Sequence, residues 1–328
     1  MCTRRTFLVS TGCSVLAVSL AARAQKSPLP VIGFVNGGSP VGSAYLAAAF
    51  RQGLKEAGYV DGQNMAIEFR WTEGHGERPQ EIFADLIRRP VALIAVGGGR
   101  AVRLAAKAAT TTIPIVFVTG NDPIAEGLVS QLGRPRGNIT GVTVPTTSLN
   151  TKRLELLNQL VPPGESIAVL VNPAISWTDS QARDVLSAGG TMGRKINIMN
   201  ASSEREIDGA FARLATSRAR ALLVSADPLY TSQLQQLVEL TQRHRIAAIF
   251  EWREFVTAGG LMSYGSDIAN GYREAGVYAG RILSGTKPSD LPVLQATKYE
   301  FVVNLTAAKS LGLTIPQALL IRADEVIQ

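Results

Sequence analysis

Residues 31–40 read VIGFVNGGSP, and this stretch decides the fold. The first five residues form an apolar run of strand length and the next five are turn residues, which predicts a buried strand that ends in a loop. A helix pattern follows, with apolar residues recurring from Leu46 to Leu54 and Gly58 as the expected C-cap. A strand, a polar turn and a helix in this order form the repeating unit of α/β proteins.

The same unit recurs along the chain. In the first half, helix patterns occupy 79–87 and 101–109, and apolar runs predict strands at 65–71, 91–96, 115–118 and 139–144. The pattern restarts with a helix at 151–160, followed by strands at 167–171, 196–199, 221–224 and 246–250. Such units build parallel sheets with helices on both faces, so the expected fold class is α/β with two Rossmann-like lobes joined by a hinge.

Two strand exits match closely in sequence. Residues 118–123 read VTGNDP and residues 224–228 read VSADP. Asp is a favourable N-cap and Pro suits the first helical turn, so each exit is expected to open a helix. The match fits two similarly built lobes, although independent capping of two helices explains it equally well.

The first residues predict an export signal. The Arg4-Arg5 pair precedes Phe7-Leu8, a short apolar stretch follows, and residues 22–24 form an A-x-A cleavage site. Paired arginines at this place are typical of the twin-arginine route. The apolar stretch is shorter than the roughly 20 residues of a membrane span. We therefore expect a signal peptide at 1–24 and a mature protein in the periplasm.

Loss of this signal limits the chemistry of the mature chain. Cys2 and Cys13 leave with it, so no thiol remains for a disulfide or a metal site. His75 and His244 lie far apart and show no metal-ligand spacing, so no metal site is expected. Removing three arginines and no acidic residue lowers the formal charge from +7 to +4. No basic cluster interleaved with aromatics occurs, so nucleic-acid binding is not expected.

Motifs of cofactor enzymes and nucleotide enzymes are missing from the sequence. Residues 97–102 follow a strand and approximate G-x-G-x-x-G, but Val102 occupies the place of the last glycine. No G-x-x-x-x-G-K-[ST] loop or G-x-S-x-G elbow occurs, and the carboxylates form no recognisable acid–base pair. We therefore expect no cofactor and no enzymatic activity.

A series of segments from residue 49 onward points, in order, to one family. They are AFRQGLKEAGYVDGQN at 49–64, EFRW at 68–71, PIVF at 114–117, GNITG at 137–141, AGGLMSYG at 258–265, GTKPSDLPV at 285–293, LGLTIP at 311–316 and RADEVI at 322–327. Together they resemble the ABC-transporter substrate-binding family that includes bacterial tryptophan- and tyrosine-binding proteins.

The resemblance implies a type I periplasmic-binding fold, whose two lobes are joined by about three crossing segments. Lobe 1 would comprise residues 31–144 plus about 264–290, and lobe 2 residues 145–263 plus about 291–328. The crossings would fall near residues 142–145, 262–264 and 291–293. The resemblance also implies that a small solute binds in the cleft by hinge closure. The closed form would then dock on an inner-membrane permease driven by a separate ATPase subunit. We expect a monomer, because hinge closure needs no partner subunit.

Ligand contacts are expected at the strand exits, where helix N-termini favour a carboxylate or another anionic group. The expected contacts are Asn36, Ser39, Gly98, Gly99, Asp122, Thr146, Asn172, Asp227, Glu251 and Tyr264. Tyr264 would close over an apolar part of the ligand, and Trp177 is a further candidate wall. Turn geometry, capping or core packing explains each of these residues as well.

Three functional classes remain open at this point. The first is an exported solute-binding protein of an ABC importer that captures an amino acid or a small carboxylate. The second is a periplasmic enzyme on a doubly wound fold, since the twin-arginine route often carries cofactor enzymes. The third is a sensor module that presents its ligand to a membrane receptor. The missing motifs and the family segments favour the first class.

Overall fold

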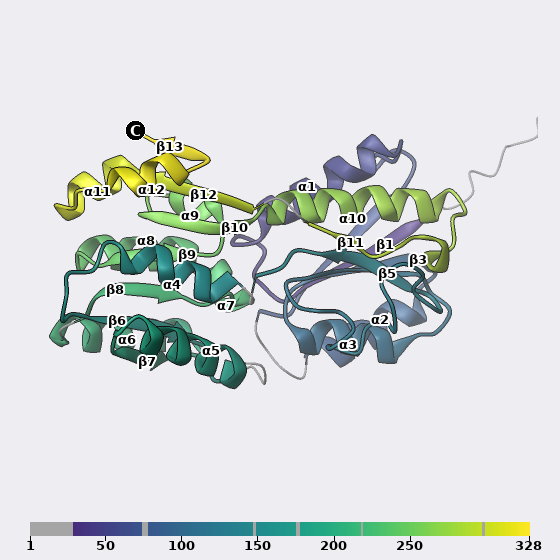
Figure 1. Cartoon of the computed structure of the whole chain (residues 1–328). Helices are drawn as coiled ribbons and strands as arrows, with labels where there is room; N and C mark the ends of the chain where they lie inside the picture. Colours follow the sequence, from purple (N-terminus) through teal and green to yellow (C-terminus); the bar gives the residue numbers. More distant parts are fainter. Residues whose placement is uncertain (1–28, 74–77, 147–148, 175–177, 218, 297–298) are drawn as a thin grey trace, which may run out of the picture.

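The computed structural model describes residues 29–328 apart from 74–77, 147–148, 175–177, 218 and 297–298. Within these residues the chain forms two sheets that lie side by side (Figure 1). The first sheet has six strands in the order β11-β5-β4-β3-β1-β2, and all of its pairs are parallel. Its strands are β1 (Val31–Asn36), β2 (Ala66–Trp71), β3 (Val91–Val96), β4 (Ile115–Thr119), β5 (Ile139–Thr143) and β11 (Leu294–Gln295).

The second sheet has seven strands in the described residues, in the order β13-β12-β10-β9-β8-β6-β7. Only the β10–β12 pair is antiparallel. The strands are β6 (Ser166–Val171), β7 (Ile196–Asn200), β8 (Ala219–Val224), β9 (Ala247–Phe250), β10 (Met262–Ser266), β12 (Tyr299–Asn304) and β13 (Glu325–Ile327). Two mainly parallel sheets confirm the predicted fold class. We call each sheet with its covering helices a lobe.

Helices cover both faces of the first sheet because alternate strand residues point to opposite sides. On one face α2 (Arg78–Arg88) and α3 (Arg100–Ala109) bury an apolar layer. The other face carries α1 (Ala44–Glu56) and α10 (Ile268–Leu283), which lie along each other in Figure 1. These two helices approach closely at Gly53, where a Cβ atom would lie 1.8 Å from the carbonyl oxygen of Arg273. A stretch near the C-terminal end of the chain thereby completes the core of lobe 1.

The second sheet is covered in the same way. One apolar layer contains side chains of α4 (Asn150–Asn158), α11 (Leu305–Leu311) and α12 (Gln317–Arg322), and α5 (Thr178–Thr191) packs beside α4. The other layer contains α6 (Glu204–Thr216), α8 (Leu234–Arg243) and α9 (Arg253–Thr257). The remaining short helices are α7 (Pro228–Ser232), which starts just after β8, and the 3-10 turn η2 (Pro288–Asp290). In the described part of the chain, every helix falls short of the length and hydropathy that a membrane span requires.

Apart from a helix at the Asp122-Pro123 exit, the strands and helices predicted between residues 31 and 250 form, with ends shifted by at most about two residues. The Asp122-Pro123 exit differs from the prediction, because the chain after β4 makes turns instead of a helix. The Asp122 carboxylate caps this turn by accepting from the backbone N–H groups of Ile124 and Ala125. The Asp227 exit does open a helix, α7. The two exits therefore share capping chemistry and differ in what they cap.

The described chain passes between the sheets three times, after β5, after β10 and after β11. Residues 262–264, expected at a crossing, belong to β10, so the second passage follows Ser266. Residues 294–295 still pair with β5, so the third passage follows Gln295 and not residues 291–293. These shifts have one reason: strand pairing continues to the rim of each sheet before the chain leaves it.

Candidate ligand-binding cleft

A cavity of about 90 Å³ lies between the carboxyl ends of the two sheets. This is the edge where parallel α/β sheets place their binding loops. Lobe 1 and the residues just after it contribute Asn36, Ser43, Leu46, Gly98, Gly99, Arg100, Arg103, Val118, Thr119, Gly120, Asn121, Val144, Thr146, Ile268 and Tyr272. Lobe 2 contributes Ala226, Asp227, Pro228, Thr231 and Trp252. The cavity is therefore built by both lobes, and its walls combine apolar side chains with a few polar groups.

The most unusual polar group of the cavity is the carboxylate of Asp227, which is 5% exposed. Its Oδ1 accepts from the backbone N–H of Leu229 at 2.7 Å and from Asn172 Nδ2 at 3.3 Å. Its Oδ2 is buried and has no hydrogen-bond partner among the described residues. Burial raises the pKa of Asp227 to about 6, against the opposing effect of these hydrogen bonds. Burying a carboxylate oxygen without a partner costs free energy, and a ligand group that is cationic or donates a hydrogen bond would offset this cost.

Trp252 forms part of the lobe 2 wall and is 4% exposed. Its indole Nε1 is buried without an acceptor among the described residues. Across the cavity, Leu46 and Val118 of lobe 1 present apolar side chains. This combination offers a ligand an apolar surface with one free N–H donor.

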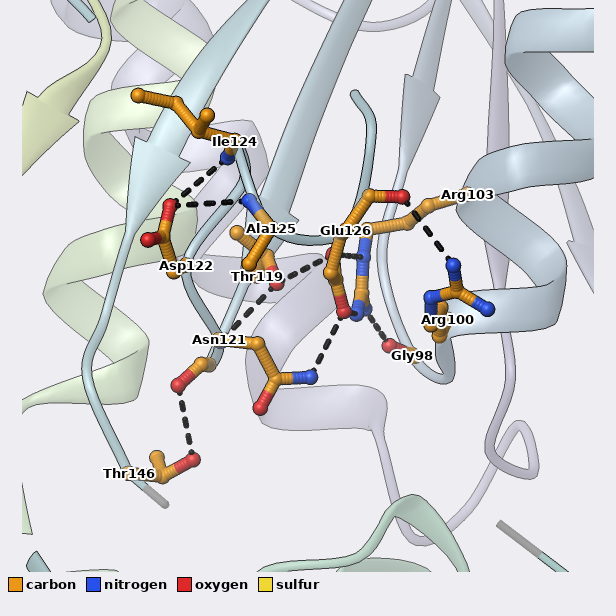
Figure 2. A network of polar contacts seen from close by, with 11 residues as sticks. Gly98, Arg100, Arg103, Thr119, Asn121, Asp122, Ile124, Ala125, Glu126 and Thr146 are labelled. Carbon is orange, nitrogen blue, oxygen red and sulfur yellow. Dashed lines mark hydrogen bonds and ion pairs between the residues drawn. The ribbon is translucent and has the colours of Figure 1, made fainter. Parts of the chain in front are cut away.

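The lobe 1 side of the cavity is held by a buried ion pair between Arg103 of α3 and Glu126 (Figure 2). Arg103 Nε donates to Glu126 Oε2 at 3.1 Å, and a second guanidinium nitrogen donates to Gly98 O. Glu126 also accepts from Thr119 Oγ1 at 3.0 Å and from Asn121 Nδ2 at 2.7 Å. The pair thus fixes two loops that line the cavity, one after β3 and one after β4.

Burial alone would raise the pKa of Glu126, but the charge of Arg103 and the hydrogen bonds to the carboxylate outweigh it. The pKa of Glu126 therefore lies below its ordinary value. The ion pair stays charged at neutral pH. Its charges compensate each other, so it leaves no net charge for a ligand to neutralise.

The N-terminal end of α3 also faces the cavity through Gly98, Gly99 and Arg100. Gly99 is the N-cap and has no side chain to satisfy the first N–H groups of this helix. Gly98 has φ +87°, and a Cβ atom there would lie 2.3 Å from Gly37 N, so only glycine fits. A helix N-terminus without a capping side chain attracts anionic groups.

A family model described as ABC transporter substrate binding protein matches residues 31–327. The chain belongs to this family. A tyrosine-binding protein of Clostridioides difficile (strain R20291) is 26% identical over 264 residues, which cover 80% of this chain and 75% of that protein. The resemblance found in the sequence is confirmed.

Solved structures share the fold. One is a conserved domain protein of Vibrio cholerae, with TM-score 0.80 and 24% identity over 90% of this chain and 99% of that one. Another is an ABC domain from Streptococcus pneumoniae in complex with L-Trp, with TM-score 0.79 and 24% identity over 91% of this chain and 100% of that one. The fold is therefore that of type I periplasmic binding proteins. As a member of the ABC transporter substrate-binding family, the protein is a binding component and not an enzyme.

Of the ligand contacts expected in this substrate-binding protein, five line the cavity: Asn36, Gly98, Gly99, Thr146 and Asp227. Asn36 donates from Nδ2 to the hydroxyl of Tyr272 at 2.7 Å, which joins β1 to α10. Thr146 donates from its backbone N–H and from Oγ1 to Gly120 O. These residues therefore shape the cavity as well as line it.

The other five expected contacts lie outside the cavity lining. Asn172 supports Asp227 from behind, and Ser39 accepts from the backbone N–H of Gly42 in the loop after β1. Asp122 is exposed on its turn. The Glu251 carboxyl is fully buried, and burial raises its pKa to about 8. Tyr264 packs on Tyr299 and Phe301 of β12.

Several lining residues gave little sequence signal. Thr119 and Asn121 belong to the recognised VTGNDP exit, and Trp252 directly follows the expected Glu251. Ile268 and Tyr272 come from α10, which only the passage after β10 brings back to lobe 1. Trp177 lies outside the described residues. In the described chain, no three His, Asp or Glu side chains converge as a metal site would require.

Proposed function

We propose that the protein captures a small zwitterion, an amino acid, in the cavity between its lobes and delivers it to an ABC importer. The carrying observation is Asp227, which lines a cavity built by both lobes and whose buried Oδ2 has no hydrogen-bond partner among the described residues. The chain acts as a monomer in the periplasm after export by its twin-arginine-type signal. The loaded form docks on an inner-membrane permease that a separate ATPase subunit drives.

Each part of an amino acid has a matching group in the cavity. The ammonium pairs with Asp227, which compensates the cost of burying that carboxylate. The carboxylate lies at the N-terminus of α3, near Arg100. An apolar or aromatic side chain packs on Leu46, Val118 and Trp252. Relatives named for tyrosine and solved with L-Trp support this class of ligand.

A thermal-shift screen tests this function directly. We expect one or a few of the twenty L-amino acids to stabilise the protein, by about 2.7 kcal/mol at a hundredfold excess over Kd. The deaminated counterparts of these amino acids, which keep the carboxylate and the side chain, should stabilise it much less. A melting temperature that stays constant with every amino acid and every small carboxylate would refute the proposal.

Hinge closure is supported by a contact at the mouth of the cavity. A Cβ atom on Gly42 of lobe 1 would lie 2.6 Å from the carbonyl oxygen of Ser232, at the end of α7 in lobe 2. The two lobes therefore touch here with no room for a side chain. A larger residue must either move the loop or hold the lobes apart.

Gly42→Val is expected to weaken amino-acid binding by about 5- to 150-fold, since overpacking costs about 1–3 kcal/mol. The cost falls on the closed form, so the melting temperature of the ligand-free protein should change little. Gly133→Val is the matched control, because no atom lies within 4 Å of a Cβ built at this exposed lobe 1 loop residue. Calorimetric titration of both variants with the best amino acid from the screen gives the comparison. Equal affinities in both would show that closure at Gly42 plays no part in binding.

Affinity is also expected to depend on pH through Asp227. The carboxylate must be ionised to pair with an ammonium, and its pKa is raised to about 6 by burial. Affinity should be full above pH 7 and fall about tenfold by pH 5, where about one carboxylate in eleven is ionised. The pKa of the neighbouring Glu251 is about 8, so its carboxyl stays mostly protonated up to pH 7. Calorimetry between pH 5 and 7 measures the profile, and a flat profile would remove Asp227 as the ammonium partner.

A further inference from the structure

A fully buried arginine joins two of the passages between the lobes to one helix of lobe 2. Arg153 lies in α4 and is 0% exposed. Its Nε donates to Tyr264 O at 2.7 Å, near the end of β10. Its Nη1 donates to Thr146 O at 3.0 Å, just after the first passage, and to Asn150 Oδ1 at 2.8 Å. Different nitrogens of one rigid guanidinium thus hold two points beside the passages: Thr146, which lies in the first, and Tyr264, which lies in β10 two residues before the second.

The surroundings of Arg153 connect it to the cavity. Burial lowers the pKa of Arg153, and the nearby carboxyl group of Glu251, which is also 0% exposed, partly opposes this effect. Oγ1 of the lining residue Thr231 lies 3.4 Å from Glu251 Oε1 and 3.0 Å from Asp227 O. The end of β10 packs directly on the backbone of Glu251, since a Cβ atom on Gly265 would lie 1.9 Å from Glu251 O. The end of β10, the buried groups Arg153 and Glu251, and the cavity wall therefore form one contiguous unit.

An apolar side chain would fill this site without the cost of burying a cation, and such a replacement often stabilises a core. Packing therefore does not explain Arg153. What an arginine adds is a planar fork that fixes two acceptors in one geometry. Both of those acceptors are carbonyls close to the points where the chain enters or leaves lobe 2. Thr146 is bonded to both lobes. Its backbone N–H donates to Gly120 O of lobe 1, and its carbonyl oxygen accepts from Arg153 of lobe 2.

We propose that Arg153 is the hinge anchor, a positioning residue that fixes the lobe 2 ends of both passages and thereby restricts the lobes to one closing motion. The inference rests on the hinge closure of the proposed function. Without the anchor the ligand-free protein samples a wider range of lobe orientations. More conformational entropy is then lost on closure.

Distances between spin labels test the anchor without any ligand. One label is placed on each lobe through Ala108→Cys in α3 and Ala212→Cys in α6, both exposed, with Cys2 and Cys13 replaced by serine. We expect Arg153→Lys, whose flexible ammonium lacks the planar fork that holds two separated donors in place, to widen the distance distribution at least about twofold. Arg153→Met combined with Glu251→Gln, which leaves no unpaired buried charge, should widen it as much. Glu251→Gln alone and the exposed neighbour Lys152→Met should keep the original width.

A merely structural arginine would lower the melting temperature without changing the width in the folded protein. Unchanged width in Arg153→Lys, with native circular dichroism, would overturn the proposal even if the double variant failed to fold. Widening in Glu251→Gln alone would also overturn it, because that variant keeps the fork. The spin-label test does not depend on the ligand of the proposed function. Even if no solute binds the protein, the distances still show whether Arg153 limits the orientations of the lobes.

Discussion

Replacing Asp227 with asparagine is expected to weaken binding of the amino-acid ligand at least about 30-fold, since truncating one partner of a buried charge pair costs about 2–5 kcal/mol. The fold should survive this change. Asn retains an oxygen that accepts from the backbone N–H of Leu229, so the cap of α7 persists. The loss of affinity would therefore be due to the missing negative charge alone.

The same variant is expected to be more stable than the natural protein. The pKa of Asp227 is raised from 3.8 to about 6, so the folded protein carries no penalty below pH 3.8 and the full penalty above pH 6. This shift corresponds to about 3 kcal/mol, which Asp227→Asn should recover at pH 7.5 and not at pH 3.5. Urea unfolding at the two pH values measures it. Better stability together with lost binding is the signature of a group retained for function.

Asp122→Asn is the matched control for this experiment. Asp122 has the same Asp-Pro context and also accepts from backbone N–H groups, but it is exposed and lies outside the cavity lining. Its replacement should leave both affinity and stability nearly unchanged. Equal losses of affinity in the two variants would mean that Asp227 acts as a cap and not as a ligand partner.

Arg103→Met is expected to lower the free energy of unfolding by about 3–5 kcal/mol, because it leaves the Glu126 carboxylate buried without its cation. Glu126 and Arg103 are 5% and 3% exposed, so water cannot replace the lost partner. Binding should weaken as well, since the loops after β3 and β4 lose a shared support. Urea unfolding and calorimetric titration measure the two effects.

A double-mutant cycle separates the pair from its surroundings. Arg103→Met combined with Glu126→Met should cost clearly less than the sum of the single changes, because no buried charge remains. Lys152→Met breaks the exposed pair with Glu155 and serves as the control, with an expected cost below about 1 kcal/mol. Additive costs for the Arg103 and Glu126 variants would contradict the interpretation of this pair as a charge-compensated support.

The order of strands and helices was predictable from the sequence because each buried strand is an apolar run that ends at a turn. The second sheet illustrates this, since the predicted run at 221–224 is buried on both faces. The rule that parallel sheets bind ligands at their carboxyl ends also brought five cavity residues, among them Asn36 and Asp227, into the prediction. Both predictions rest on local patterns and on one general property of α/β sheets.

The rest of the site depends on contacts between distant parts of the chain. Tyr272 accepts a hydrogen bond from Asn36, which lies 236 residues earlier in the chain, and no local sequence pattern predicts that contact. The two Asp-Pro exits are alike in sequence, but Asp227 is buried at the start of a helix, whereas Asp122 is exposed on a turn. Glu251 was expected in the cleft and instead lies behind it, beside Arg153. Tertiary packing decides how deeply each of these side chains is buried, and this cannot be predicted from the residues at the end of a strand alone.

The central claim is that the free carboxylate oxygen of Asp227 selects a ligand with an ammonium group. Calorimetric titration at pH 7.5 with the best amino acid from the screen, and with its deaminated analogue, tests this most directly. We expect saturable one-to-one binding of the amino acid and at least about 30-fold weaker binding of the analogue. Equal affinity for the two compounds would contradict it.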